Sequence, residues 1–308
     1  MFVFLLPYVC ASLWGHVGEE TEKLRQREGM PQAQEAAGYE ILVKYDWGVW
    51  ALPLEEYLVY KLSAVMPQEY EKEALKAQAV LLRTEVVEAL REEDTKSLQI
   101  SGGGMERWYE TDTGSEAYLP WRQAVEETAG LYLCCEGEPI QASYFKLSNG
   151  QTRDAAEVWD TDTRPYLTGI SCVQDKAARD YSSIVKVSRT NYVRTLQARL
   201  TGNFSQQEIL EGAAVSYDSA GYVTKVSFSV ENKETQEIDG EEFRYLFDLP
   251  SASFEMEQEK TQVIFRVTGV GHGFGMSQYG ANCMALNGET YDQILAEFFF
   301  RTELAKFE

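Results

Sequence analysis

A glycine-rich segment near the end of the chain has the composition of a ligand-binding loop. Gly269–Ala281 reads GVGHGFGMSQYGA; its glycines alternate around His272, and the polar residues that follow are Ser277, Gln278 and Tyr279. Alternating glycines let a backbone approach a ligand closely, and a strand–glycine–helix junction leaves N–H groups free at the helix start. The pattern predicts either a binding loop or a tight strand-to-helix turn around a core histidine.

A second polar segment, Tyr144–Asp160, follows a predicted strand. Residues 148–152 read SNGQT and offer hydroxyl, amide and backbone groups of the kind that hydrogen-bond to sugar hydroxyls or amides. Lys146 precedes this turn, and its ammonium group either pairs with a carboxylate or lies in solvent. The segment therefore predicts either a sugar-contacting turn or an ordinary loop.

Carboxylates are numerous where the first two predicted helices meet. They are Glu55, Glu56, Glu69, Glu71 and Glu73. Most are expected on solvated helix faces, because charged residues of amphipathic helices lie opposite the apolar stripe.

Charge and composition exclude several classes of function. The 308 residues include 49 Asp and Glu against 28 Lys and Arg, for a net charge of −21. Such a chain repels phosphate backbones, so we expect no nucleic-acid partner. Two histidines and five cysteines, without CxxC or HExxH, do not supply a zinc site, and the GK[ST] of a phosphate loop is absent. We expect no metal and no cofactor.

Hydrophobic periodicity predicts an α+β chain. A stripe of buried residues at helical spacing is expected at Leu54, Leu58, Leu62 and Val65. The expected helices cover residues 53–66, 69–92, 124–128, 192–200, 206–210 and 240–247, with two more at the chain end. The expected strands cover residues 39–45, 49–52, 131–135, 140–146, 213–217, 222–230 and 261–268. Thr290 and Gln293 form a capping-box pattern at the start of the last helix.

The N-terminal 15 residues, MFVFLLPYVCASLWG, are apolar and uncharged. This run is short for a membrane span of about 20 residues. It resembles the apolar part of an export signal or anchor without its basic front end; the alternative is an N-terminal core strand. Residues 16–38 are acidic and unperiodic, which is typical of a linker.

Taken in order, four segments resemble the stage II sporulation protein D family, also called the SpoIID/LytB domain. They read LEEYLVYKLSAVMPQEYEKEALKAQAVLLRT, AVEETAGLYLCCEGEPIQASYFKLSNGQTRDAAEVWD, IDGEEFRYLFDLPSASF and GVGHGFGMSQYGANCMALNGETYDQIL. The order and spacing agree from about Tyr39 to Phe299, and the pairing of EALKAQAV with GHGxGMSQYGA is specific to the family.

The resemblance implies an α+β fold with a core of residues 39–170 and 256–303, a smaller second lobe over about residues 175–255, and a cleft between them. It implies an exported protein, in the cell wall or on the outer face of the cytoplasmic membrane. Its partners would be peptidoglycan glycan strands and other sporulation wall-remodelling proteins, during engulfment of the forespore. The implied family activity is lytic transglycosylase cleavage of MurNAc–GlcNAc bonds, in which one carboxylic acid protonates the glycosidic oxygen and then acts as a base.

Two family positions are changed in this chain. The family acid immediately precedes the Met-Pro that ends the first helix, where this sequence has Val65, and the family histidine before the polar turn is replaced by Phe145. The resemblance assigns substrate binding to the other candidates, which are Lys146, Ser148, Asn149, Gly150, Thr152, His272, Gly273, Ser277, Gln278 and Tyr279. We expect the sugar site in a cleft between the His272 loop and the Ser148–Thr152 turn, with Val65 facing it.

Three functions remain open at this point. Valine cannot transfer a proton, so an enzyme would need a displaced carboxylate such as Glu69 or Glu56. A catalytically silent protein would bind peptidoglycan without cutting it. A scaffold of a sporulation complex would have no affinity for glycan.

Overall fold

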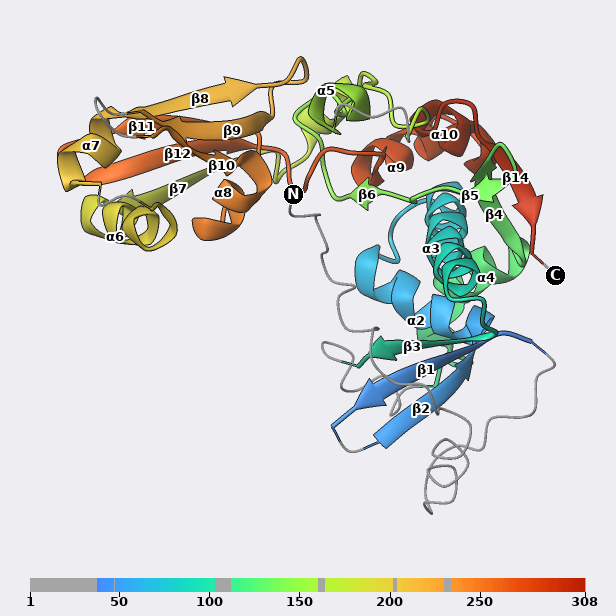
Figure 1. Cartoon of the computed structure of the whole chain (residues 1–308). Helices are drawn as coiled ribbons and strands as arrows, with labels where there is room; N and C mark the ends of the chain where they lie inside the picture. The colour runs from blue at the N-terminus through green and yellow to red at the C-terminus, as the bar shows by residue number, and fades with distance from the viewer. Residues whose placement is uncertain are drawn as a thin grey trace.

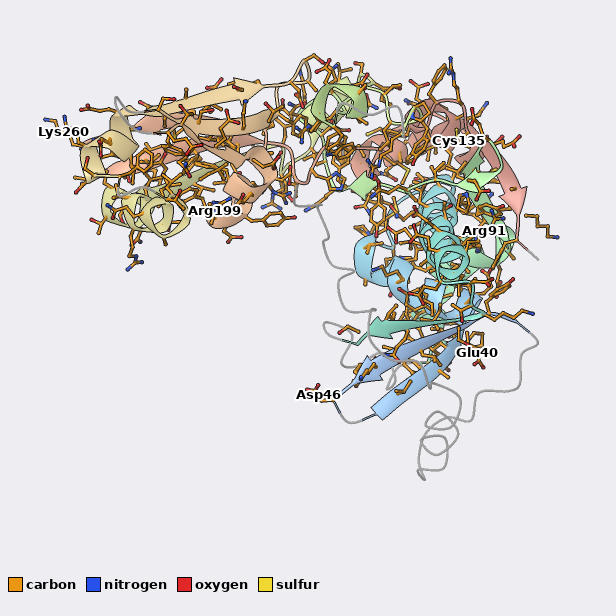
Figure 2. All side chains as sticks on the ribbon, in the orientation of Figure 1. Glu40, Asp46, Arg91, Cys135, Arg199 and Lys260 are labelled. Atoms are coloured by element: carbon orange, nitrogen blue, oxygen red, sulfur yellow. The ribbon has the colours of Figure 1, made fainter. Side chains whose placement is uncertain are left out.

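The computed structural model describes residues 38–46, 48–102, 112–159, 164–201, 204–229 and 234–307. Figure 1 shows a larger first lobe, which contains the helical core, and a β-rich second lobe at the left of the view. Helices and strands are both abundant, so the α+β class is confirmed. Charged side chains such as Arg199 and Lys260 point outward from the second lobe (Figure 2). The apolar run at residues 1–15, and the linker over residues 16–38 except Gly38, lie outside the described residues.

The first lobe begins with the expected hairpin. Strand β1 (Glu40–Tyr45) pairs antiparallel with β2 (Gly48–Pro53). A third strand that the sequence pattern did not reveal, β3 (Ser97–Ser101), adds to β1 in parallel. Its burial pattern has no strict alternation, which explains why periodicity missed it.

Two helices follow, α2 (Leu54–Val65) and α3 (Lys72–Glu92). Leu54, Leu58 and Leu62 are buried as predicted, whereas Val65 is only partly buried against the core. Helix α3 starts three residues later than expected. Glu71 is the extended N-cap residue, and its N–H is held by Asn282 Oδ1 at 2.7 Å, so the chain does not turn helical before Lys72.

One of the helix-junction carboxylates, Glu55, has a structural partner, although its side chain is partly exposed. Glu55 binds the fully buried guanidinium of Arg83 through both oxygens, at 2.8 and 2.6 Å. The same guanidinium donates to the carbonyls of Val125 and Leu131. Arg83 therefore ties α2 and α3 to the next two elements, and its burial is tolerated because its donors are satisfied.

The rest of the first lobe packs around α3. Its helices are α4 (Leu119–Glu127), α5 (Ala155–Trp159), α9 (Gln278–Leu286) and α10 (Tyr291–Phe298), with 3₁₀ turns η2 (Glu116–Tyr118) and η3 (Val173–Ala177). Its strands are β4 (Leu131–Cys135), β5 (Glu138–Pro139), β6 (Tyr144–Phe145), β13 (Met276–Ser277) and β14 (Glu303–Lys306). The capping box of α10 is present. On β4, Cys134 is buried and Cys135 partly buried, both as free thiols.

The strand expected over residues 140–146 was mostly wrong. Only Tyr144–Phe145 pairs, in parallel with Met276–Ser277. Before it, the N–H of Gln141 donates to the Tyr166 hydroxyl rather than to a neighbouring strand. The apolar composition of residues 140–146 did not indicate that only two of them pair as a strand.

The second lobe contains two three-stranded sheets and three helices among its described residues. Its strands are β7 (Ser182–Ser188), β8 (Ala213–Tyr217), β9 (Val223–Phe228), β10 (Gln236–Asp239), β11 (Phe254–Gln258) and β12 (Gln262–Thr268), in the orders β10-β9-β8 and β11-β12-β7. Its helices are α6 (Arg189–Arg199), α7 (Gln206–Glu211) and α8 (Gly240–Leu246). Phe243, Phe247, Phe254 and Phe265 form its aromatic centre, with ring centroids 4.9–6.1 Å apart.

The boundary between the lobes differs from the expected one. Strand β12 was expected in the first lobe, but Val263, Phe265 and Val267 pack in the core of the second. Conversely, η3 packs against α9 of the first lobe. The second lobe therefore runs from β7 to β12, residues 182–268, because β12 pairs with both β11 and β7.

Within the described ranges, no helix has the length and apolar character that a membrane span requires.

Candidate functional site

The residues singled out from the sequence do not form one site. Val65, Lys146 and Tyr279 lie on one surface, His272 lines a pocket between the lobes, and most of the others are buried between these two places. We call the first the Val65 surface, defined by Val65, Tyr70, Lys146, Asp180 and Tyr279. We call the second the interlobe pocket.

Val65 is the last residue of α2, and its surroundings are held by amides. Gln278 Nε2 donates to Val65 O at 3.1 Å and to Gln78 Oε1 at 3.0 Å. Gln278 is thus engaged in joining α2, α3 and α9. The Gln78 side chain is fully buried, and its Nε2 has no hydrogen-bond partner among the described residues. An amide donor therefore lies unused close to the end of α2.

The rest of the Val65 surface is polar and open. Lys146 pairs with Asp180 at 3.0 Å, both more than half exposed, and the ammonium group lowers the pKa of Asp180. The N–H of Tyr279 donates to Lys146 O at 3.2 Å. Burial raises the pKa of the Tyr70 hydroxyl, and nearby Tyr279 adds to the effect. Lys146 and Tyr279 are therefore the predicted residues that remain accessible here.

Two predicted residues, Ser148 and Ser277, meet at a buried carboxylate. Asp175 Oδ2 accepts the N–H of Ser148 at 2.8 Å and the hydroxyl of Ser277 at 2.6 Å, and all three residues are fully buried. Desolvation raises the pKa of Asp175, while these hydrogen bonds oppose the shift. Asp175 joins the polar turn to the start of α9. It lies in a segment with no periodic pattern, so no sequence signal pointed to it.

Of the remaining polar-turn residues, Asn149 connects the lobes, whereas Thr152 and Gly150 have their contacts within the first lobe. Asn149 Nδ2 donates to Ala220 O at 2.7 Å and to Ser253 Oγ at 2.9 Å, both in the second lobe. Thr152 Oγ1 accepts from the N–H of Ile170 at 2.9 Å. At Gly150, φ is +111°, and a Cβ would lie 2.3 Å from the Lys176 side chain. The turn thus uses its polar groups within the protein.

The expected cleft between the His272 loop and this turn does not exist. Leu147 and Val270 form a β-bridge, with N–H to carbonyl distances of 3.0 and 2.7 Å in the two directions. The loop lies directly against the turn because Gly269, at φ +74°, passes so close that a Cβ would lie 2.8 Å from Leu147 O and 2.9 Å from Ser148 C. Gly273 similarly has no room for a Cβ beside Tyr222.

The ring of His272 is fixed in the loop. Its Nδ1 accepts the N–H of Phe274 at 3.1 Å, and the ring also hydrogen-bonds the backbone of Tyr144. Desolvation, followed by the positive charges of Arg244 and Arg153, lowers the pKa of His272 to about 4. The imidazole is therefore neutral at neutral pH, with both nitrogens used, and the partly buried residue lines the interlobe pocket.

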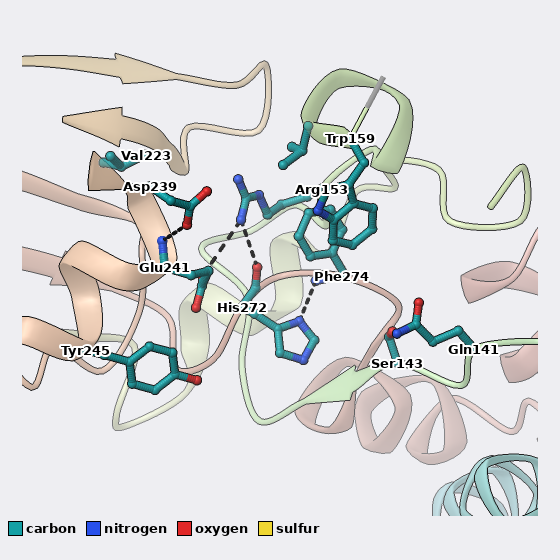
Figure 3. A pocket seen from close by; sticks show the side chains of 11 residues that line it. Gln141, Ser143, Arg153, Trp159, Val223, Asp239, Glu241, Tyr245, His272 and Phe274 are labelled. Atoms are coloured by element: carbon teal, nitrogen blue, oxygen red, sulfur yellow. Dashed lines mark hydrogen bonds and ion pairs between the residues drawn. The ribbon is translucent and has the colours of Figure 1, made fainter. Parts of the chain in front are cut away.

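The interlobe pocket opens beside His272 and has a volume of about 180 Å³. The first lobe contributes Gln141, Ser143, Arg153, Val158, Trp159, His272 and Phe274, and the second contributes Val223, Asp239, Glu241 and Tyr245. Figure 3 shows the two groups facing each other across Arg153 and His272. Val65 does not line this pocket. The carboxylates that line it are Asp239 and Glu241.

Arg153 is the charged centre of the pocket. Its side chain is 2% exposed and reaches from the first lobe to Asp218 of the second, with Nε to Oδ2 at 2.6 Å. Its Nη1 lies 3.8 Å from Glu241 Oε1 and donates to His272 O at 3.4 Å. The guanidinium also stacks over Phe274, 4.5 Å from the ring centroid. Arg153 thus joins the two lobes, as Asn149 does, and its position in the sequence did not indicate this.

Among the described residues, no group of three His, Cys, Asp or Glu side chains could hold a metal ion.

Comparison with known proteins identifies the relatives of this chain. The family model described as "Stage II sporulation protein" matches residues 47–134. Stage II sporulation protein D of Bacillus subtilis (strain 168) is 31% identical over 268 residues, which cover 83% of this chain and 75% of that protein. The chain belongs to the stage II sporulation protein D family.

Two further relatives agree with this assignment. Stage II sporulation protein D of Bacillus amyloliquefaciens is 29% identical, over 83% of this chain and 75% of that protein. An amidase enhancer of Bacillus subtilis (strain 168) is 26% identical, over 79% of this chain and 39% of that protein. Family membership connects the chain with a role related to sporulation and the cell wall.

Proposed function

We propose that this stage II sporulation protein D relative is an exported cell-wall protein that binds peptidoglycan glycan strands and does not cut them. The observation that carries the non-cutting half is Val65 at the last residue of α2, where the resemblance places the proton-transferring acid. A lytic transglycosylase needs one carboxylic acid that is first proton donor and then base. An isopropyl group has no proton to give.

Neighbouring carboxylates are poorly placed to substitute. Glu69 is exposed and lies beyond the end of α2. Glu56 has its pKa raised by burial and by Asp112, which suits an acid. It is nine residues before Val65, however, which corresponds to about 13 Å along a helix.

The surfaces on either side of the His272 loop support binding. The Val65 surface offers Lys146 and Tyr279 to hydroxyl and carboxylate groups of a glycan strand. The interlobe pocket combines aromatic walls, Trp159, Phe274 and Tyr245, with polar groups. Aromatic faces beside convergent hydrogen-bonding groups are a common arrangement of ligand sites.

A paired assay tests both halves of the proposal. Purified protein is incubated with intact sacculi and with glycan strands freed of their peptides, and bound protein and soluble muropeptides are then measured. We expect the protein to sediment with sacculi and no 1,6-anhydro muropeptides to appear. Anhydro products from the unmodified protein would overturn the non-cutting half and indicate an enzyme with a displaced carboxylate. Absence of sedimentation would overturn the binding half and favour a scaffold of other wall-remodelling proteins.

A further inference from the structure

The interlobe pocket contains a carboxylate oxygen that the protein does not use. Asp239 is the N-cap residue of α8, and its Oδ1 accepts the N–H groups of Glu241 and Glu242 at 2.8 and 3.4 Å. Its Oδ2 makes no hydrogen bond with any described residue. That oxygen is accessible to solvent, and Asp239 lines the pocket.

A second carboxylate beside it is also incompletely paired. The Glu241 side chain is 12% exposed, and its buried Oε1 has no hydrogen bond within the described part of the chain. Arg153 Nη1 lies 3.8 Å from this oxygen, too far for a hydrogen bond, and its Nε is directed to Asp218. Only Oε2 is well paired, with Arg244 at 2.7 Å. A buried carboxylate oxygen without a donor is unfavourable.

Carboxylates outnumber cations on the side of the pocket around Asp239; a further cation, Arg164, lies on the opposite side, where it stacks over Trp159. Three carboxylates, Asp218, Asp239 and Glu241, face two guanidiniums, Arg153 and Arg244. Desolvation is the main cause that raises the pKa of both Asp239 and Glu241. A cation brought into the pocket would stabilise their ionised forms. His272, fixed and neutral, supplies no such charge.

The other walls of the pocket indicate what kind of molecule would carry the cationic group. Val158, Trp159 and Phe274 form an apolar side, with Trp159 stacked on Phe274 at 4.2 Å between ring centroids. Tyr245 on α8 is 55% exposed, with its ring at the pocket. These walls suit a compact ring or short chain.

We propose that the interlobe pocket binds a primary ammonium group on a compact body, with Asp239 Oδ2 as the accepting atom and Glu241 as the second anion. The inference that this ammonium group belongs to a component of the cell wall rests on the proposed function. Peptidoglycan offers this chemistry from two sources, an amino sugar without its acetyl group or the free amine of a diamino acid in the peptide stem.

Titration calorimetry on the full chain at neutral pH tests the proposal with three probes. These are a tetrasaccharide of glucosamine, its fully N-acetylated counterpart, and meso-diaminopimelic acid. We expect at least one amine probe to bind and the N-acetylated sugar to bind about tenfold to hundredfold more weakly than its amine form, as for loss of one charged hydrogen bond. Binding of the glucosamine probe alone would identify the sugar as the source of the ammonium group. Binding of meso-diaminopimelic acid alone would identify the peptide stem as its source.

Asp239→Asn is the decisive variant, because asparagine caps a helix as well as aspartate does and the fold is retained. It should weaken amine binding about tenfold or more, and Glu241→Gln should have a similar effect. Glu242→Gln is the matched control, since Glu242 pairs with Arg199 outside the pocket. Failure of both amine probes, equal binding of amine and N-acetylated sugars, or unchanged binding in Asp239→Asn would overturn the proposal. Retained sacculus binding in that case would leave the proposed function intact.

Discussion

The Val65 surface and the interlobe pocket differ in where their residues come from. The Val65 surface is built where motif segments meet, next to two buried amides: Gln278 donates both to Gln78 and to Val65 O at the end of α2. The pocket takes Asp239, Glu241 and Tyr245 from the second lobe, none of which was singled out as a site residue. In this molecule the motif residues mainly hold segments together, and groups open to a ligand lie largely beside them.

Val65→Glu should have the largest effect, because it restores an acid at the family position. The unused Nε2 donor of Gln78 lies near the end of α2 that would carry this carboxylate. We expect 1,6-anhydro muropeptides to form, with a rate about 10²–10⁴ above that of the unmodified protein. Val65→Gln, which has the same shape without an acid, is the control. Equal activity of the two variants would mean that the Val65 surface is not a catalytic site.

Arg153→Met tests whether the pocket is also the joint between the lobes. It leaves Asp218, 1% exposed, without its partner. We expect the free energy of unfolding to fall by about 3–5 kcal/mol, as for a buried ion pair broken on one side. Urea denaturation measures this. Arg266→Met, which removes a pair with Glu257 that is more than half exposed on both sides, should cost under about 1 kcal/mol.

Unfolding free energies measured over a range of pH test whether His272 has a structural role. Its folded pKa of about 4 lies below the ordinary value of 6.5, so the unfolded chain takes up a proton first as the pH falls. The contribution of the neutral ring is present above pH 6.5, is lost between about pH 6.5 and 4, and totals about 3 kcal/mol. The difference in unfolding free energy between the unmodified protein and His272→Gln should therefore shrink over that range. An imidazole NMR titration of His272 with a midpoint near 6.5 would contradict this.

The smallest losses of folding stability are expected when two serines that cap helices are replaced. Ser277 caps α9 and also donates to buried Asp175, whereas Ser188 only caps α6, where its Oγ accepts the N–H of Asn191. Ser277→Ala should cost about 2–3 kcal/mol and Ser188→Ala about 1 kcal/mol, by thermal or urea unfolding. Equal losses would show that the hydroxyl of Ser277 adds nothing beyond its cap.

Several features followed directly from the sequence. Leu54, Leu58 and Leu62 recur at helical spacing, and α2 buries them; the Thr290–Gln293 pair forms the capping box of α10. Each of these features lies within one helix, where side-chain spacing alone decides which groups share a face or meet. The motif segments were also sufficient to indicate the family.

Only the tertiary structure decided which polar groups are available. Arg153 and Asp218 are 65 positions apart, and Ser277 and Asp175 are 102 apart. Nothing in the local pattern of either residue marks its partner, because periodicity carries no information about contacts between distant segments. The sequence determined the elements and an aliphatic residue at position 65; the packing of two lobes determined that His272 is satisfied internally while Asp239 is left open.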